Sequence, residues 1–74
     1  MKNDIQIAIL CQNIKGLREK NNLSQKEMAK ILGIGVAGLA KIEQGIIPPR
    51  ASTNIIFKLS QYFKIKPHEL FMPL

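Results

Sequence analysis

The chain has 74 residues, a length that allows one domain, residues 1–74, and excludes a multidomain protein. Eleven Lys and Arg residues against 5 acidic residues give a net charge of +6. This charge supports two readings equally: a polyanionic partner such as nucleic acid, or a charge that only keeps the chain soluble. The single cysteine, Cys11, excludes an internal disulfide, fits a reducing cytoplasm and is expected on a buried helix face.

A first helix is predicted over residues 5–20, because apolar side chains recur there at the spacing of one helical face: Ile7, Leu10, Ile14 and Leu17. The pair Asn21-Asn22 ends it. The apolar run IQIAILC in this segment is too short for a secretory signal, and no stretch approaches the ~20 apolar residues of a membrane span. We therefore expect a cytoplasmic protein.

The second helix has clear start and stop signals. Ser24 is a good N-cap, and Glu27, three residues later, completes a capping box. The helix runs to about Leu32, where Gly33 ends it because glycine readily adopts the left-handed conformation.

A third helix begins after Gly35 and runs to about Gln44, with Gly45 as its stop signal. Its sequence, GVAGLAKIE, is rich in small and apolar residues. Gly38 lies inside it and weakens it by about 1 kcal/mol relative to Ala.

The last third of the chain predicts two more helices. Prolines keep the connection IIPPRA, residues 46–51, out of helix. Ser52 caps a fourth helix, whose apolar face is formed by Ile55, Ile56, Leu59 and Phe63. Pro67 suits the first position of a short fifth helix, PHELF. Five helices in one short chain predict an all-α domain.

Residues 25–44 have the residue types that a helix-turn-helix requires. Two steeply crossing helices need a small residue at their contact, which Ala29 supplies, and the turn needs Gly33. The positions that must be apolar on both helices are occupied by Met28, Leu32, Ile34, Leu39 and Ile42.

With the flanking stretches LSQKEMA, IEQG and HELF, the chain resembles the Cro/phage-repressor-type helix-turn-helix regulators over about residues 10–71. The resemblance implies a five-helix, lambda-repressor-like DNA-binding domain, in a transcriptional regulator that is most often a repressor acting as a homodimer on near-palindromic sites. It also implies an ion pair between Arg18 and Glu43 that ties the third helix to the first.

The resemblance places helix 36–44 in the major groove of double-stranded DNA, with the second helix across the backbone. Expected DNA contacts are Ser24, Gln25, Lys26, Gln44 and Arg50, with base contacts from Val36, Ala37, Ala40 and Lys41. Of the base-reading positions, only Lys41 can read a base through hydrogen bonds, whereas Val36 and Ala37 can touch thymine methyl groups. We therefore expect DNA binding with modest sequence specificity and an affinity that falls steeply with salt concentration.

Apolar area near the C-terminus suggests a dimer surface formed by Tyr62, Phe71, Met72 and Leu74, although Phe71 can equally well close the monomer core. An alternative reading uses the apolar face of helix three to bind a protein, as in an antirepressor or an antitoxin-like partner. Catalysis is not expected: with Cys11 and His68 alone there is no zinc set, no phosphate-cradling loop appears, and no cofactor is implied.

Overall fold

The computed structural model describes residues 4–47 and 52–74, and the regular structure in these ranges is helical. The elements are α1 (Asp4–Lys20), α2 (Gln25–Leu32), α3 (Val36–Glu43), α4 (Ser52–Phe63) and the 3₁₀ helix η1 (Pro67–Phe71). The all-α prediction is confirmed, but the count of five is corrected to four α-helices within the described ranges. The fifth segment closes i→i+3 bonds instead, from Glu69 N to Lys66 O and from Met72 N to Glu69 O, because the five residues Pro67–Phe71 are too few for a stable α-helix.

The predicted caps of α2 are present. The Ser24 hydroxyl accepts a hydrogen bond from the backbone N–H of Glu27 at 3.0 Å, and the Glu27 carboxylate accepts one from Ser24 N at 2.8 Å. Gly33 ends the helix in the left-handed conformation with φ 72°. Its successor Ile34 donates its N–H to Ala29 O at 2.9 Å, which turns the chain directly towards α3.

Helix α3 begins at Val36, after the N-cap residue Gly35, which provides no side-chain cap, and ends at Glu43, one residue before the predicted boundary. Gly45 follows with φ 102°, and Ile46 donates its N–H to Lys41 O at 2.9 Å. Helix α4 begins at Ser52 itself, the residue predicted as its cap; residues 48–51 of the connection lie outside the described ranges.

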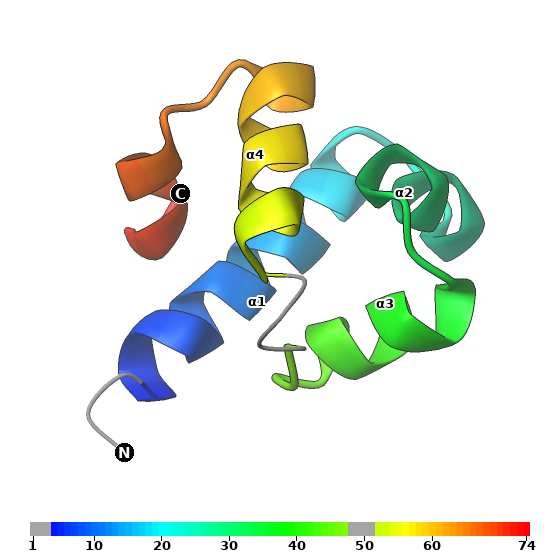
Figure 1. The fold of residues 1–74 in the computed structure, drawn as a ribbon, viewed down its shortest axis with the longest axis horizontal. Helices are drawn as coiled ribbons and strands as arrows, with labels where there is room; N and C mark the ends of the chain where they lie inside the picture. The colour runs from blue at the N-terminus through cyan, green and yellow to red at the C-terminus, as the bar shows by residue number, and fades with distance from the viewer. Residues whose placement is uncertain (1–3, 48–51) are drawn as a thin grey trace.

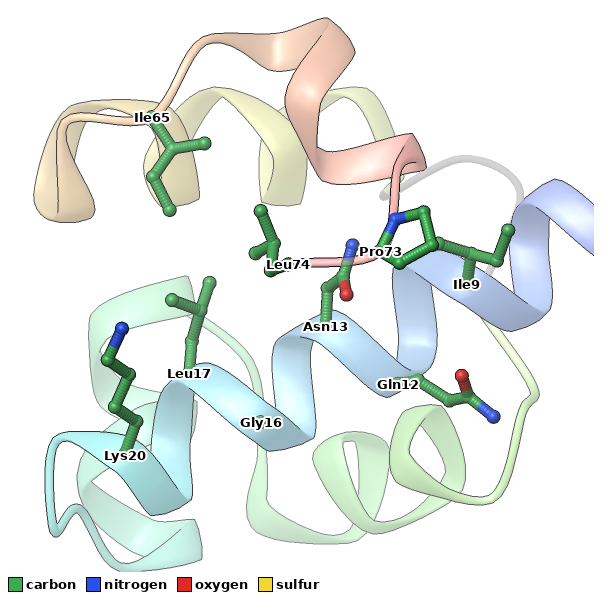
Figure 2. Close-up of a pocket in the computed structure, with 9 residues that line it drawn as sticks. All are labelled: Ile9, Gln12, Asn13, Gly16, Leu17, Lys20, Ile65, Pro73 and Leu74. Carbon is green, nitrogen blue, oxygen red and sulfur yellow. The ribbon is translucent and has the colours of Figure 1, made fainter.

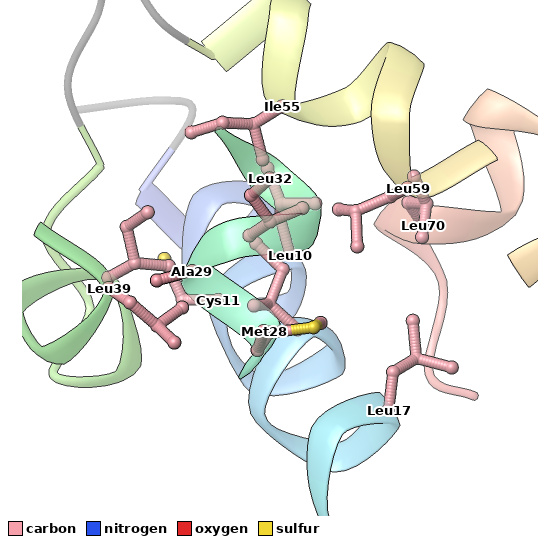
Figure 3. Close-up of a cluster of buried hydrophobic side chains, with 12 residues drawn as sticks. Leu10, Cys11, Leu17, Met28, Ala29, Leu32, Leu39, Ile55, Leu59 and Leu70 are labelled. Carbon is pink, nitrogen blue, oxygen red and sulfur yellow. The ribbon is translucent and has the colours of Figure 1, made fainter. Parts of the chain in front are cut away.

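The core draws on all five elements: each of the four α-helices contributes buried residues of helical spacing, and η1 contributes Leu70 (Figure 3). Within the described residues it contains Leu10, Cys11, Ile14, Leu17, Met28, Ala29, Leu32, Leu39, Ile42, Ile55, Leu59 and Leu70. Cys11 is buried, as predicted, and burial raises the pKa of its thiol. The chain thus places a small hydrophobic residue, not a reactive thiolate, at this position.

Figure 1 shows how these helices are arranged around α1. The α2–α3 pair lies on one side of α4 and the C-terminal segment with η1 on the other. Helix α1 contacts both α3 and η1, so it connects the two sides of the molecule. Helix α3 packs against α1 and α2, and α2 in turn packs against α4, so α3 has a fixed support behind its exposed face.

We expect the substitutions Gly33→Ala and Gly38→Ala to have opposite effects on stability. At φ 72°, Ala costs about 1–2 kcal/mol, and its Cβ would stand 2.5 Å from Lys58 Nζ, which must move. At Gly38 a Cβ meets nothing within 4 Å, so Ala should stabilise the helix by about 1 kcal/mol. Urea denaturation of the two variants measures both; a Gly33→Ala variant as stable as the parent would contradict this account of the turn.

Candidate nucleic-acid interface

The expected ion pair between α1 and α3 is present and is bidentate. Arg18 Nε donates to Glu43 Oε2 at 2.6 Å, and Arg18 Nη2 donates to Oε1 at 3.2 Å. The remaining terminal nitrogen, Nη1, donates to the backbone carbonyl of Leu23 at 3.0 Å. Only 16% of the Arg18 side chain and 6% of the Glu43 side chain are exposed. The guanidinium therefore joins α1, the loop before α2 and the end of α3 in one geometry.

A third helix enters the same network through Gln25, the first residue of α2. Its amide Nε2 donates to Glu43 Oε1 at 3.0 Å. Sequence reasoning assigned Gln25 to the DNA surface and did not find this bond, because nothing in the linear spacing brings residues 25 and 43 together. The Glu43 carboxylate thus fixes the relative positions of α1, α2 and α3.

The ionisation of this pair follows from its partners. Burial raises the pKa of the Glu43 carboxyl, but the hydrogen bonds from Arg18 and Gln25, together with the positive charge of Arg18, outweigh it and hold that pKa below its ordinary value. The hydrogen bond to Glu43 raises the pKa of Arg18, so both groups are charged at neutral pH.

The outward face of α3 presents the residues predicted to read bases. Val36 is 44% exposed, Ala37 and Lys41 are exposed, and Ala40 is half-buried at the edge of this face. The opposite face of the helix, with Leu39 and Ile42, is completely buried. A helix anchored in this way presents a narrow surface of small side chains around one lysine.

Polar groups that were predicted to meet phosphates lie at the start of α2. Ser24 and Lys26 are exposed, and Gln25 is half-buried against Glu43. The first N–H groups of an α-helix have no intrahelical acceptor, and the helix dipole adds positive potential at this end. Gln44, the C-cap of α3, is exposed, whereas Arg50 lies outside the described residues.

The sequence analysis missed two polar side chains: one fixes the C-terminal segment to α1, and the other lies close to the turn between α2 and α3. Asn13 is 8% exposed, and its Nδ2 donates to Leu70 O at 2.7 Å and to Met72 O at 2.8 Å. These bonds fix the C-terminal segment to α1. The position of Asn13 beside the apolar stripe of α1 was the signal in the sequence that could have indicated a buried polar residue. Lys58 lies over Gly33, close to the turn between α2 and α3.

The residues proposed for a dimer surface come from two parts of the chain: Tyr62 is on α4, Phe71 ends η1, and Met72 and Leu74 follow it. Tyr62 borders a hollow shared with Ile31 and Lys58, whereas Leu74 borders a separate groove beside α1. Phe71 is partly buried and packs against the core, which agrees with the reading that it closes the monomer.

Within residues 4–47 and 52–74, no three His, Cys, Asp or Glu side chains gather in a group that could hold a metal ion. In the same part of the chain, none of the helices has the length and apolar character needed to cross a bilayer.

Comparison with known proteins places this arrangement in a family. The helix-turn-helix family matches residues 14–70, a range that includes α2, α3 and the Arg18–Glu43 pair. An uncharacterised helix-turn-helix-type transcriptional regulator of Methanocaldococcus jannaschii is 32% identical over 59 residues, which are 80% of this chain and 86% of that protein. No solved structure matches the chain. The chain belongs to the Cro/phage-repressor-type helix-turn-helix family, and both α2 and α3 lie within the matched residues.

Proposed function

We propose that this protein is a DNA-binding transcriptional regulator, acting as a repressor without catalysis, which inserts α3 into the major groove of double-stranded DNA. The observation that supports this role is the division of α3 into two faces. Leu39 and Ile42 are completely buried, while Val36, Ala37 and Lys41 are exposed on a helix held by a bidentate ion pair. The net charge of +6 supplies attraction to phosphates.

Base recognition then rests mainly on shape and on one lysine. Lys41 can donate hydrogen bonds to guanine O6 and N7, while Val36 and Ala37 are placed to touch thymine methyl groups. Because these side chains are small, the helix backbone approaches the bases closely. Sequence-dependent groove shape therefore contributes to the discrimination between sites.

The test is selection of bound duplexes from a random pool, followed by titration of a selected duplex at 50 and 200 mM salt. With about four phosphate contacts per copy, affinity should fall about a hundredfold between these concentrations. The Lys41→Ala variant should bind more weakly and lose preference at one or two base pairs of the selected site. An affinity that barely responds to salt would contradict the phosphate-driven binding mode.

We also propose that two copies act together, because one α3 reads about half of a binding site. Near-palindromic selected sequences, with half-sites about one helical turn apart, are then expected. Sedimentation in the presence of a selected duplex measures the stoichiometry directly; a strict 1:1 complex on a palindromic duplex would rule out the pair.

The alternative function, docking of a protein on the apolar face of α3, predicts no duplex binding even at low salt. Val36 is the one large hydrophobic residue of α3 that is substantially exposed. Larger exposed apolar side chains stand on α1, on α4 and after η1: Ile5, Phe57, Tyr62, Met72 and Leu74. The titration of a duplex at 50 mM salt distinguishes the two functions, because only the DNA-binding function predicts a complex there.

A further inference from the structure

A groove of about 540 Å³ runs along α1 on the side of the C-terminal segment (Figure 2). On α1 it follows Ile9, Gln12, Gly16 and Lys20, which share one face of the helix. Ile65 and Leu74 form the opposite wall, and Leu74 is 63% exposed. No residue of α2 or α3 lines this groove, so an occupant would leave the proposed DNA surface uncovered.

Gly16 opens the floor of the groove. A Cβ at this position would meet nothing within 4 Å, so packing inside the described protein does not require glycine there. Glycine in the middle of a 17-residue helix also weakens that helix relative to Ala. The missing side chain at Gly16 leaves room for another backbone to approach α1 closely.

The dimensions suit a helix. From Ile9 to Lys20 the groove follows α1 for about 16 Å, the length of three helical turns. Apolar side chains flank the open floor at Gly16, as in the helix-in-groove mode of recognition, in which anchors at i, i+3, i+4 and i+7 fill a groove.

The charges around the groove define the occupant further. Lys20 lines one end, and Ile65 stands between two exposed lysines, Lys64 and Lys66. The groove lining itself contains no Asp or Glu. Lys20, Lys64 and Lys66 together outweigh the one carboxylate that Leu74 carries as the last residue of the 74-residue chain, so an acidic occupant is attracted and a basic one repelled.

A second copy of this chain does not meet that requirement. It carries a charge of +6, and of its five acidic residues all but Asp4 and Glu19 are already used: Glu43 by the ion pair, Glu27 by the cap of α2 and Glu69 by Lys66 N. Exposed Glu19 lies 3.8 Å from Arg18 Nη2. Like-charged copies would repel each other across a groove bordered by lysines.

We infer that the groove between α1 and the C-terminal segment binds an acidic amphipathic helix of a partner protein, whose apolar side chains fill the groove and whose carboxylates meet Lys20. This site is independent of the proposed DNA surface on α3. A regulator bound to DNA through α3 can therefore bind a partner protein through this groove at the same time.

The inference is tested with a synthetic amphipathic peptide of about 14 residues, about 21 Å long when helical. Its leucines stand at i, i+3, i+4 and i+7, and glutamates occupy the outer positions. We expect the peptide to shift the backbone amide resonances of Ile9, Gly16 and Lys20 in the ¹⁵N-labelled 74-residue protein, and to leave those of Ala37 and Lys41 unchanged. Adding a selected DNA duplex should not displace it.

Two variants provide matched controls. Gly16→Leu fills the floor and should weaken peptide binding at least about tenfold, whereas Gly16→Ala should change it less than about threefold. Both should melt no lower than the parent, because Ala and Leu favour helix more than Gly does. Lys20→Glu should weaken the acidic peptide about threefold and favour a version with lysines at the outer positions.

Three results would overturn the inference. One is equal binding of the lysine-bearing peptide and the glutamate-bearing peptide to the parent protein. Another is unchanged affinity in Gly16→Leu. The third is a shift of the groove amides on simple concentration of the protein without peptide, which would assign the groove to a second copy. Because duplex binding is measured separately, failure here leaves the DNA-binding proposal unaffected.

Discussion

Replacing Glu43 by Ala should lower the free energy of unfolding by about 3–5 kcal/mol, because it leaves the mostly buried Arg18 with only the exposed carboxylate of Glu19, 3.8 Å from Nη2, as a counter-charge. The substitution also removes the acceptor for Gln25, so α2 loses its bond to the end of α3. A domain of this size has a free energy of unfolding of about 4–11 kcal/mol, so the loss is a large fraction of its stability and the variant should unfold at a much lower temperature than the parent. Urea denaturation at neutral pH gives the difference.

The double substitution Arg18→Met with Glu43→Leu is the matched control. It removes both charges and keeps apolar volume in their place, and such replacements are often neutral or stabilising. We expect the double variant to be far more stable than Glu43→Ala. If both variants lose the same stability, the cost arises from packing at this position rather than from an uncompensated charge.

The same pair gives a pH dependence of known sign. Because the pKa of Glu43 in the folded protein lies below its ordinary value of 4.5, its contribution to stability is fully present above that pH. The contribution is lost as the pH falls through the folded pKa. Comparison of the parent with Glu43→Gln in urea between pH 7 and pH 3 isolates it, since the amide does not titrate. A parallel decline of both proteins would show that other carboxylates dominate.

Ala37→Asp should abolish most of the affinity for DNA, by about a hundredfold, while leaving the fold intact. A carboxylate on the exposed face of α3 would point into a groove bordered by phosphates, and like charges at an interface cost several kcal/mol. Stability should hardly change, because the site is exposed and the first turn of a helix favours a negative charge. Titration with a selected duplex and thermal melting measure the two properties.

The control for Ala37→Asp is Gln61→Glu, which makes the same change of one charge unit at an exposed position of α4. It should weaken DNA binding only slightly, through the lower net charge. Similar losses in both variants would mean that overall charge rather than the position of α3 determines binding, and the proposed docking face would then be wrong.

Local signals in the sequence predicted the helices well, because each cap acts within a few residues. Ser24 and Glu27 form their capping box, and Gly33 and Gly45 adopt left-handed conformations, as expected. The last segment was predicted as the fifth helix of the domain, but it is a 3₁₀ helix, since propensity alone does not distinguish one α-helical turn from a 3₁₀ turn in PHELF. The pair of Arg18 and Glu43 was expected through family resemblance, not through their spacing.

What the sequence determined by itself is the set of helices, the apolar face of each and the identity of the small side chains on α3. Those features depend on neighbours three or four positions away, and a linear pattern records them. Only the tertiary structure decided that Gln25 donates to Glu43, that Asn13 fixes the C-terminal segment, and that Gly16 opens a groove. Each of these features depends on how distant segments or neighbouring side chains approach in space, and periodicity along one chain does not encode that distance.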